Sequence, residues 1–167
     1  RARSETGPSG SFQAGASRGE GCAQEDSTRW QRTVGQLWLE LARCAVWSAQ
    51  YERCTAIARQ VIELGHAIAD PDLIAGGQLE LGRALWRLGD YQAARGVLEA
   101  MPPLSASQAW TAAQVVNTLG NIHYAQGALE EAEAQYRQAL AIQQQADIWG
   151  NRVQVLNNLA TIAALRG

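Results

Sequence analysis

The sequence contains no lysine, and all fourteen of its basic residues are arginines. A Walker A loop and a Schiff-base enzyme each need a lysine, so both classes are excluded. The patterns GxGxxG, HExxH and CxxC are also absent, and with them the common signatures of dinucleotide binding, zinc proteases and dithiol redox centres. Glu130, Glu131 and Glu133 resemble a carboxylate cluster, but they open a predicted helix, whose N-terminal end favours acidic residues. We therefore expect no enzymatic activity and no cofactor.

Cysteine and histidine are scarce. The three cysteines, Cys22, Cys44 and Cys54, cannot all pair with one another, and Cys54 occupies a position that suits a small buried residue. We expect reduced thiols and a cytoplasmic protein. The two histidines, His66 and His123, are not spaced as a metal-binding pair.

Long apolar runs and an excess of either charge are also missing. No stretch has the length and apolar character of a signal peptide or a membrane span. The net charge of −2 argues against nucleic acid or an anionic membrane as a partner, since both favour a basic face. The 167 residues, 47% of them hydrophobic, suffice for one domain with a buried core.

Residues 1–25 contain five glycines and four serines but no leucine, isoleucine or valine. Such a segment buries too little apolar surface to offset the entropy lost on ordering, so we predict a flexible tail or linker. Asp26, Ser27 or Thr28 is predicted to cap the first helix. The chain begins with Arg and stops inside a repeat frame, and we therefore expect it to be a fragment of a longer protein.

Residues 113–146 predict two amphipathic helices joined at Gly127, and this unit recurs along the chain. Gly120 and Ala132 lie twelve residues apart, and so do Gly82 and Ala94. Small residues at these positions let two helix backbones approach closely. The corresponding positions Ala42, Gly82, Gly120 and Ala160 are 40, 38 and 40 residues apart, a spacing that is typical of a stacked solenoid.

The stretches LGRALWRLGDYQAARGVLEAM and LGNIHYAQGALEEAEAQYRQAL resemble the tetratricopeptide repeat, in a long-helix variant found in bacterial multidomain regulators. The resemblance implies an all-α, right-handed solenoid of three helix pairs plus a seventh helix. It places the domain at residues 26–167, with repeats at about 35–68, 75–108 and 113–146 and a partial copy at 153–167. Cys54 and His123 depart from the family pattern, and Pro102-Pro103 should end the second copy early.

In that family the first helix of each pair lines a concave groove that holds proteins or extended peptides. The groove-facing positions correspond here to Glu40, Arg43 and Trp47; Glu80, Arg83, Trp86 and Arg87; Gln114, Asn117, Asn121 and Tyr124; and Gln154, Asn157 and Asn158. Asn and Gln both donate and accept hydrogen bonds, which suits a peptide backbone. The same side chains also occur on helix faces that only meet water.

We therefore expect a protein-interaction or peptide-binding scaffold, the sensor or partner-binding arm of a larger regulatory protein. Two alternatives stay open: a structural oligomerisation module whose groove has no ligand, and a domain that senses a small molecule through its tryptophans. The seventh helix is apolar on more than one face, which favours self-association through residues 153–165 or a further repeat. Trp30, Trp110 and Trp149 precede helix frames and are predicted to join consecutive pairs.

Overall fold

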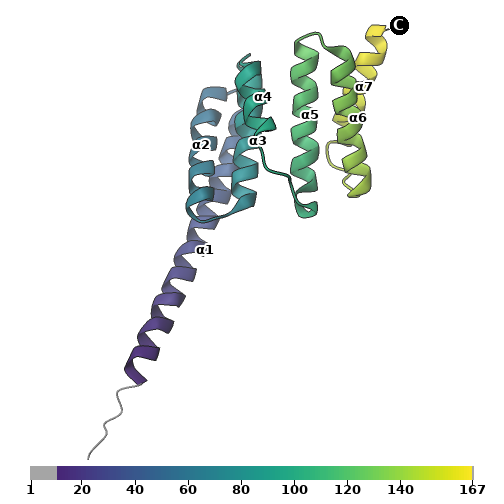
Figure 1. Ribbon diagram of the computed structural model, residues 1–167. Helices are drawn as coiled ribbons and strands as arrows, with labels where there is room; N and C mark the ends of the chain where they lie inside the picture. Colours follow the sequence, from purple (N-terminus) through teal and green to yellow (C-terminus); the bar gives the residue numbers. More distant parts are fainter. Residues whose placement is uncertain (1–10, 167) are drawn as a thin grey trace, which may run out of the picture.

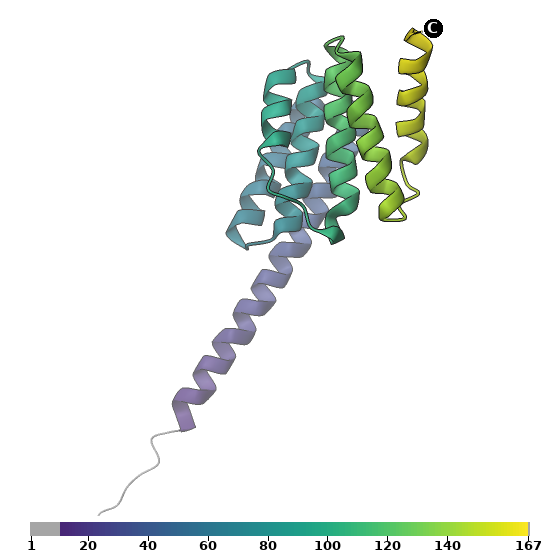
Figure 2. The ribbon, with the colours of Figure 1, turned by 45° about the vertical axis from the view of Figure 1, so that its right-hand side comes forward.

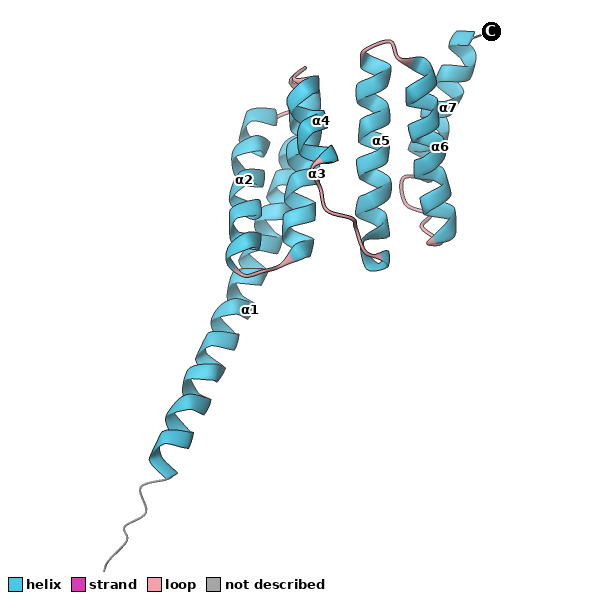
Figure 3. Cartoon of the chain, viewed as in Figure 1, coloured by secondary structure: helices cyan, strands magenta, loops and turns pink. Residues whose placement is uncertain are grey.

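Seven α-helices and one short 3-10 helix make up the computed structural model, which describes the backbone of residues 11–166 and the side chains of residues 24–166 (Figure 3). This part of the chain contains no strand, so the all-α prediction is confirmed. The elements are α1 (Ser11–Trp47), α2 (Tyr51–Ala67), α3 (Pro71–Arg87), α4 (Tyr91–Glu99), the 3-10 helix η1 (Ala106–Gln108), α5 (Ala109–Ala125), α6 (Leu129–Gln145) and α7 (Arg152–Arg166).

The helices stack in chain order (Figures 1 and 2). Within the pairs, α1 packs on α2, α3 on α4 and α5 on α6. Between the pairs, α2 packs on α3 and α6 on α7, and the first helices also meet, α1 with α3 and α3 with α5. This arrangement is a helical-repeat solenoid, in which each pair is covered by its neighbours.

Close helix crossings occur where the sequence predicted them, at two glycines. A Cβ atom on Gly82 would lie 2.6 Å from Cδ2 of Leu98, and one on Gly120 would lie 2.6 Å from Cε1 of Tyr136. Leu98 and Tyr136 are both 2% exposed. In each pair a large side chain of the second helix therefore fills the space that the glycine of the first helix leaves.

The turns within pairs use left-handed backbone conformations. Gly89 (φ 84°) and Gly127 (φ 80°) end the first helices of the second and third pairs, where glycine adopts this conformation without strain. The first pair has Ala49 (φ 57°) at the same place. A Cβ atom in this region crowds the following carbonyl oxygen, so the first turn is strained.

The second helix of the second pair ends early, as the two prolines predict. α4 has 9 residues, whereas α2 and α6 have 17 each. Pro102 and Pro103 have no N–H to continue the helical hydrogen bonding. Met101 still packs against the core cluster that contains Leu98 and Ile122, so the shortened pair keeps its place in the stack.

Helix α1 begins at Ser11, inside the segment that we expected to be a flexible tail, and the prediction is wrong for residues 11–25. The hydroxyl of Thr28 donates to the carbonyl oxygen of Gln24 at 3.0 Å, a bond of a helix interior, so Thr28 is no cap. Extending an existing helix costs much less than nucleating one, and no proline interrupts residues 11–25. Residues 1–10 lie outside the described residues. The N-terminal half of α1 projects beyond the other helices (Figure 1).

Helix α7 is the last described helix, and α6 covers only one of its sides. Val155 and Ile162 are each 1% exposed and pack with the α6 residues Ala132 and Tyr136. Val153 is 69% exposed and Leu156 is 46% exposed. An apolar flank of α7 therefore faces solvent.

Candidate functional site

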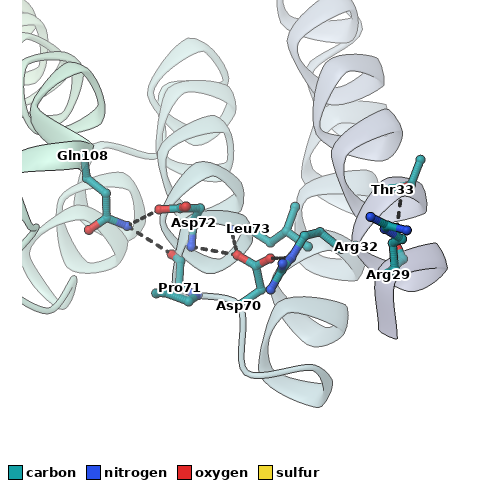
Figure 4. Close-up of polar contacts among 8 residues, drawn as sticks. All are labelled: Arg29, Arg32, Thr33, Asp70, Pro71, Asp72, Leu73 and Gln108. Carbon is teal, nitrogen blue, oxygen red and sulfur yellow. Dashed lines mark hydrogen bonds and ion pairs between the residues drawn. The ribbon is translucent and has the colours of Figure 1, made fainter. Parts of the chain in front are cut away.

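A hollow of about 940 Å³ lies near the N-terminal ends of α3 and α5; we call it the N-terminal hollow. Asp70 caps α3, accepting hydrogen bonds from the backbone N–H groups of Asp72 (3.0 Å) and Leu73 (3.1 Å). Its second oxygen pairs with Nε of Arg32 on α1 at 2.6 Å. Gln108 donates from Nε2 to Oδ1 of Asp72 at 2.8 Å (Figure 4). These contacts join α1, the N-terminal end of α3 and η1, and the charges of Arg32 and Asp70 are paired with each other.

A fully buried carboxylate lies deeper between α1 and α3. Glu80 is 0% exposed, and its Oε1 lies 3.5 Å from Nε of Arg43 and 3.4 Å from a terminal nitrogen of Arg83. Burial raises the pKa of Glu80, and the attraction of Arg83 and Arg43 offsets this effect only in part. The guanidinium of Arg43 also lies 5.3 Å from the ring centroid of Trp110 on α5. Glu80 therefore holds two arginines in place across successive pairs.

Asparagine side chains connect α5 and α7 through an amide network. Nδ2 of Asn158 donates to Oδ1 of Asn117 at 3.1 Å and to Oδ1 of Asn121 at 3.3 Å. The hydroxyl of Tyr136 donates to the same oxygen of Asn121 at 2.8 Å. Burial raises the pKa of Tyr136, so this hydroxyl keeps its proton. The network aligns the first helices of the third and fourth copies.

Two hollows of about 520 and 170 Å³ lie at the other end of the groove, near the C-terminal ends of α1, α3 and α5. They share Trp86, Arg87, Asn121 and Gln154, and we call them together the aromatic trough. The residues that line only one of the two are Val46, Trp47, Tyr51, Arg83, Asn117 and Thr118 in the smaller hollow, and Tyr91, Tyr124, Ala125, Tyr136, Asn158 and Thr161 in the larger. Six aromatic side chains thus line these two adjoining hollows.

The third helix pair identifies the family. Residues 113–146, which span α5 and α6 and include the Gly120–Tyr136 crossing, match the family model described as tetratricopeptide repeat. Residues 113–146 form a tetratricopeptide repeat. No curated protein matches it in sequence.

The predicted groove residues fall into three groups by exposure. Glu40, Trp47, Arg87, Tyr124, Gln154 and Asn157 are exposed; Arg43, Arg83, Trp86, Asn121 and Asn158 are half-buried; and Glu80, Gln114 and Asn117 are buried. Of the buried three, Glu80 lies against Arg43 of the neighbouring first helix α1. Asn117 accepts a hydrogen bond from Asn158 of α7 and lines the smaller hollow of the aromatic trough. Asn157 is exposed but lines none of the three hollows described.

Several residues of the site are absent from the sequence prediction. Tyr51 and Tyr91 line the aromatic trough from the first turns of the second helices. They lie forty residues apart, so the repeat period could have identified them as equivalent. Arg32 and Asp70 pair across two helices, and no local sequence pattern signals this pairing.

The tryptophans that precede the helix frames differ in role. Trp110 packs against the core cluster that contains Leu79 and Leu98 of the second pair, as predicted, and it also contacts Arg43 of the first pair. Trp30 is 68% exposed and Trp149 is 72% exposed, so the prediction is wrong for both. Trp149 contacts only nearby groups: its Nε1 donates to Asp147 at 2.9 Å, and its ring lies 4.3 Å from the guanidinium of Arg152.

The described residues hold no group of three or more His, Cys, Asp and Glu side chains that could bind a metal ion. Cys54 is buried, and burial raises the pKa of its thiol to about 12, so it is a protonated packing residue. Cys44 is exposed and unpaired with Cys54. Among the described helices, none combines the length and apolar character that crossing a membrane requires.

Proposed function

We propose that this chain binds an extended peptide segment of a partner protein along its groove, with the aromatic trough as the main contact surface. The repeat itself suggests a protein-interaction scaffold. The finer proposal rests on the trough, where Gln154 and Asn121 offer amides and Trp86 and Tyr124 offer aromatic faces in one depression. Amides can pair with peptide N–H and C=O groups, and aromatic rings bury large area at low entropic cost.

We further propose that the groove is the partner-binding arm of a larger cytoplasmic regulator. The N-terminal hollow gives the groove a rigid end, because Arg32 of α1 pairs with Asp70 at the start of α3 and Gln108 of η1 donates a hydrogen bond to Asp72. Neither nucleic acid nor a membrane is proposed as a partner, since the net charge is −2.

A selection of displayed short linear peptides on the immobilised chain tests the groove. The expected result is enrichment of peptides whose affinity falls at least severalfold for Gln154→Ala and for Tyr124→Ala. Gln138→Ala on α6 is the matched control, because Gln138 is an exposed helical glutamine that lines none of the hollows described. Failure to enrich any peptide, or equal losses for Gln138→Ala and Gln154→Ala, would contradict the proposal.

A second candidate function, self-association, is favoured by the exposed flank of α7. Ala160 lies where the first helices of the second and third pairs carry Gly82 and Gly120, and those glycines are buried against their second helices, whereas Ala160 is exposed. We propose that a second copy of the chain covers this flank. Small and apolar residues allow close helix contact between two such surfaces.

A further inference from the structure

The two ends of the groove differ in charge. The N-terminal hollow is lined by Arg32 and Arg43 but also by Glu40, Asp70 and Asp72. The aromatic trough is lined by Arg83 and Arg87, and no Asp or Glu is among its described lining residues. Within residues 24–166 the trough therefore combines two arginines with aromatic side chains and has no carboxylate in its lining.

Arg87 is the cation of the trough that remains available to a ligand. Arg83 pairs with the buried Glu80, and its side chain is only 15% exposed. Arg87 is exposed, and none of the ion pairs formed within residues 24–166 involves it. Its guanidinium lies 4.3 Å from the ring centroid of Trp86. Stacking on the ring restricts the guanidinium while leaving its N–H donors free, so less entropy is lost when it binds an anion.

The side chains around Arg87 indicate which kind of ligand group should lie next to the bound anion. Tyr91 and Tyr124 line the larger hollow together with Trp86, while Asn121 and Gln154 supply amides to both hollows. The larger hollow, of about 520 Å³, lies within the size range of pockets that hold small ligands. It therefore has room for a peptide side chain of substantial size.

We propose that the trough recognises an acidic peptide in which a carboxylate pairs with Arg87 and a neighbouring aromatic or large aliphatic side chain packs against Trp86 and Tyr124. This proposal rests on the proposed peptide-binding function and specifies the partner. An arginine fork binds a carboxylate through two parallel hydrogen bonds, which gives orientation as well as affinity. The opposite end of the groove, where carboxylates outnumber arginines, disfavours a second acidic residue, so the peptide should bind in one direction.

The test repeats the peptide selection with three forms of the chain: wild type, Arg87→Gln and Arg59→Gln. Arg59 is an exposed arginine on α2 that lines none of the hollows described, so Arg59→Gln is the matched control for the lost charge. Wild type and Arg59→Gln should enrich Asp or Glu next to Trp, Phe or Leu. Arg87→Gln should lose the acidic preference and keep the apolar one.

Enriched peptides are then synthesised with the acid replaced by its amide, and with free or amidated C-termini. Loss of the carboxylate should weaken binding to wild type about tenfold, and to Arg87→Gln hardly at all. The free and amidated forms show whether a side chain or the C-terminus supplies the carboxylate. Selected peptides that depend on Gln154 but show no acidic preference would overturn this inference and leave the groove proposal intact. An acidic preference that persists in Arg87→Gln would overturn it as well.

Discussion

Gly120→Ala separates two opposing effects of adding one methyl group. The new Cβ would lie 2.6 and 2.7 Å from two ring atoms of Tyr136. That ring is 2% exposed, and its hydroxyl is held by Asn121, so it has little freedom to move away. Overpacking of this kind costs about 1–3 kcal/mol. In a helix interior, alanine is more stabilising than glycine by about 1 kcal/mol because of its higher helix propensity. We therefore expect a net loss of stability of about 1–2 kcal/mol, because the rigid ring places the clash in the upper part of its range.

Gly96→Ala is the matched control for this prediction. Gly96 lies inside α4, and no atom lies within 4 Å of the Cβ that alanine would add. The helix-propensity gain of about 1 kcal/mol should therefore appear alone, as increased stability. Subtracting the stability change of Gly96→Ala from that of Gly120→Ala cancels the helix-propensity gain. The remainder is the steric cost at the α5–α6 crossing.

Thermal melts and urea unfolding measure both variants. For a chain of this size, 1 kcal/mol corresponds to about 2–4 °C in Tm. Gly120→Ala should melt below the wild type and Gly96→Ala above it. If Gly120→Ala stabilises the protein as much as Gly96→Ala does, the α5–α6 crossing is not as close as described, and the repeat register derived from it fails.

Three further predictions concern other parts of the stack. Ala49→Gly should raise stability by up to about 1 kcal/mol, because it relieves the positive φ in the first turn; an unchanged or lower Tm would contradict the strain. The pKa of Glu80 is raised in the folded state, so its contribution to stability is full at low pH and declines as pH rises above the ordinary glutamate range of about 4.3. The stability of Glu80→Gln minus that of wild type should therefore increase between about pH 4 and pH 7 in urea titrations, and a constant or falling difference would refute this. In sedimentation experiments wild type should dimerise with rising concentration and Leu156→Gln should not; a wild type that stays monomeric would refute association through α7.

The helix pairs could be predicted because their signals are local. The twelve-residue step from Gly120 to Ala132 and the turn glycine Gly127 fall within one repeat, and such short-range spacing reports directly on helix faces. The early end of α4 follows from two prolines in the same way. In contrast, the extension of α1 back to Ser11 was missed, because composition describes an average tendency and an established helix propagates across unfavourable residues.

The groove was harder to predict because exposure depends on neighbours that are distant in sequence. Glu80 and Asn117 have the expected positions on their helices, yet both are buried because an adjacent first helix covers them. The spacing of Glu80 and Arg83 on one helix indicates that they pair, but the burial of Glu80 against Arg43 of the preceding copy is not visible in that spacing. Burial of this kind depends on contacts between copies, which residue spacing within one copy does not contain.

The central claim is that a peptide lies in the groove, and photo-cross-linking tests it most directly. A selected peptide carrying a benzophenone group is bound, irradiated and mapped by mass spectrometry. Cross-links should fall on α3, α5 and α7 at the aromatic trough, including Trp86, Tyr124 and Gln154. Cross-links confined to the exposed positions of α2 and α6, such as Arg59 and Gln138, would contradict the account.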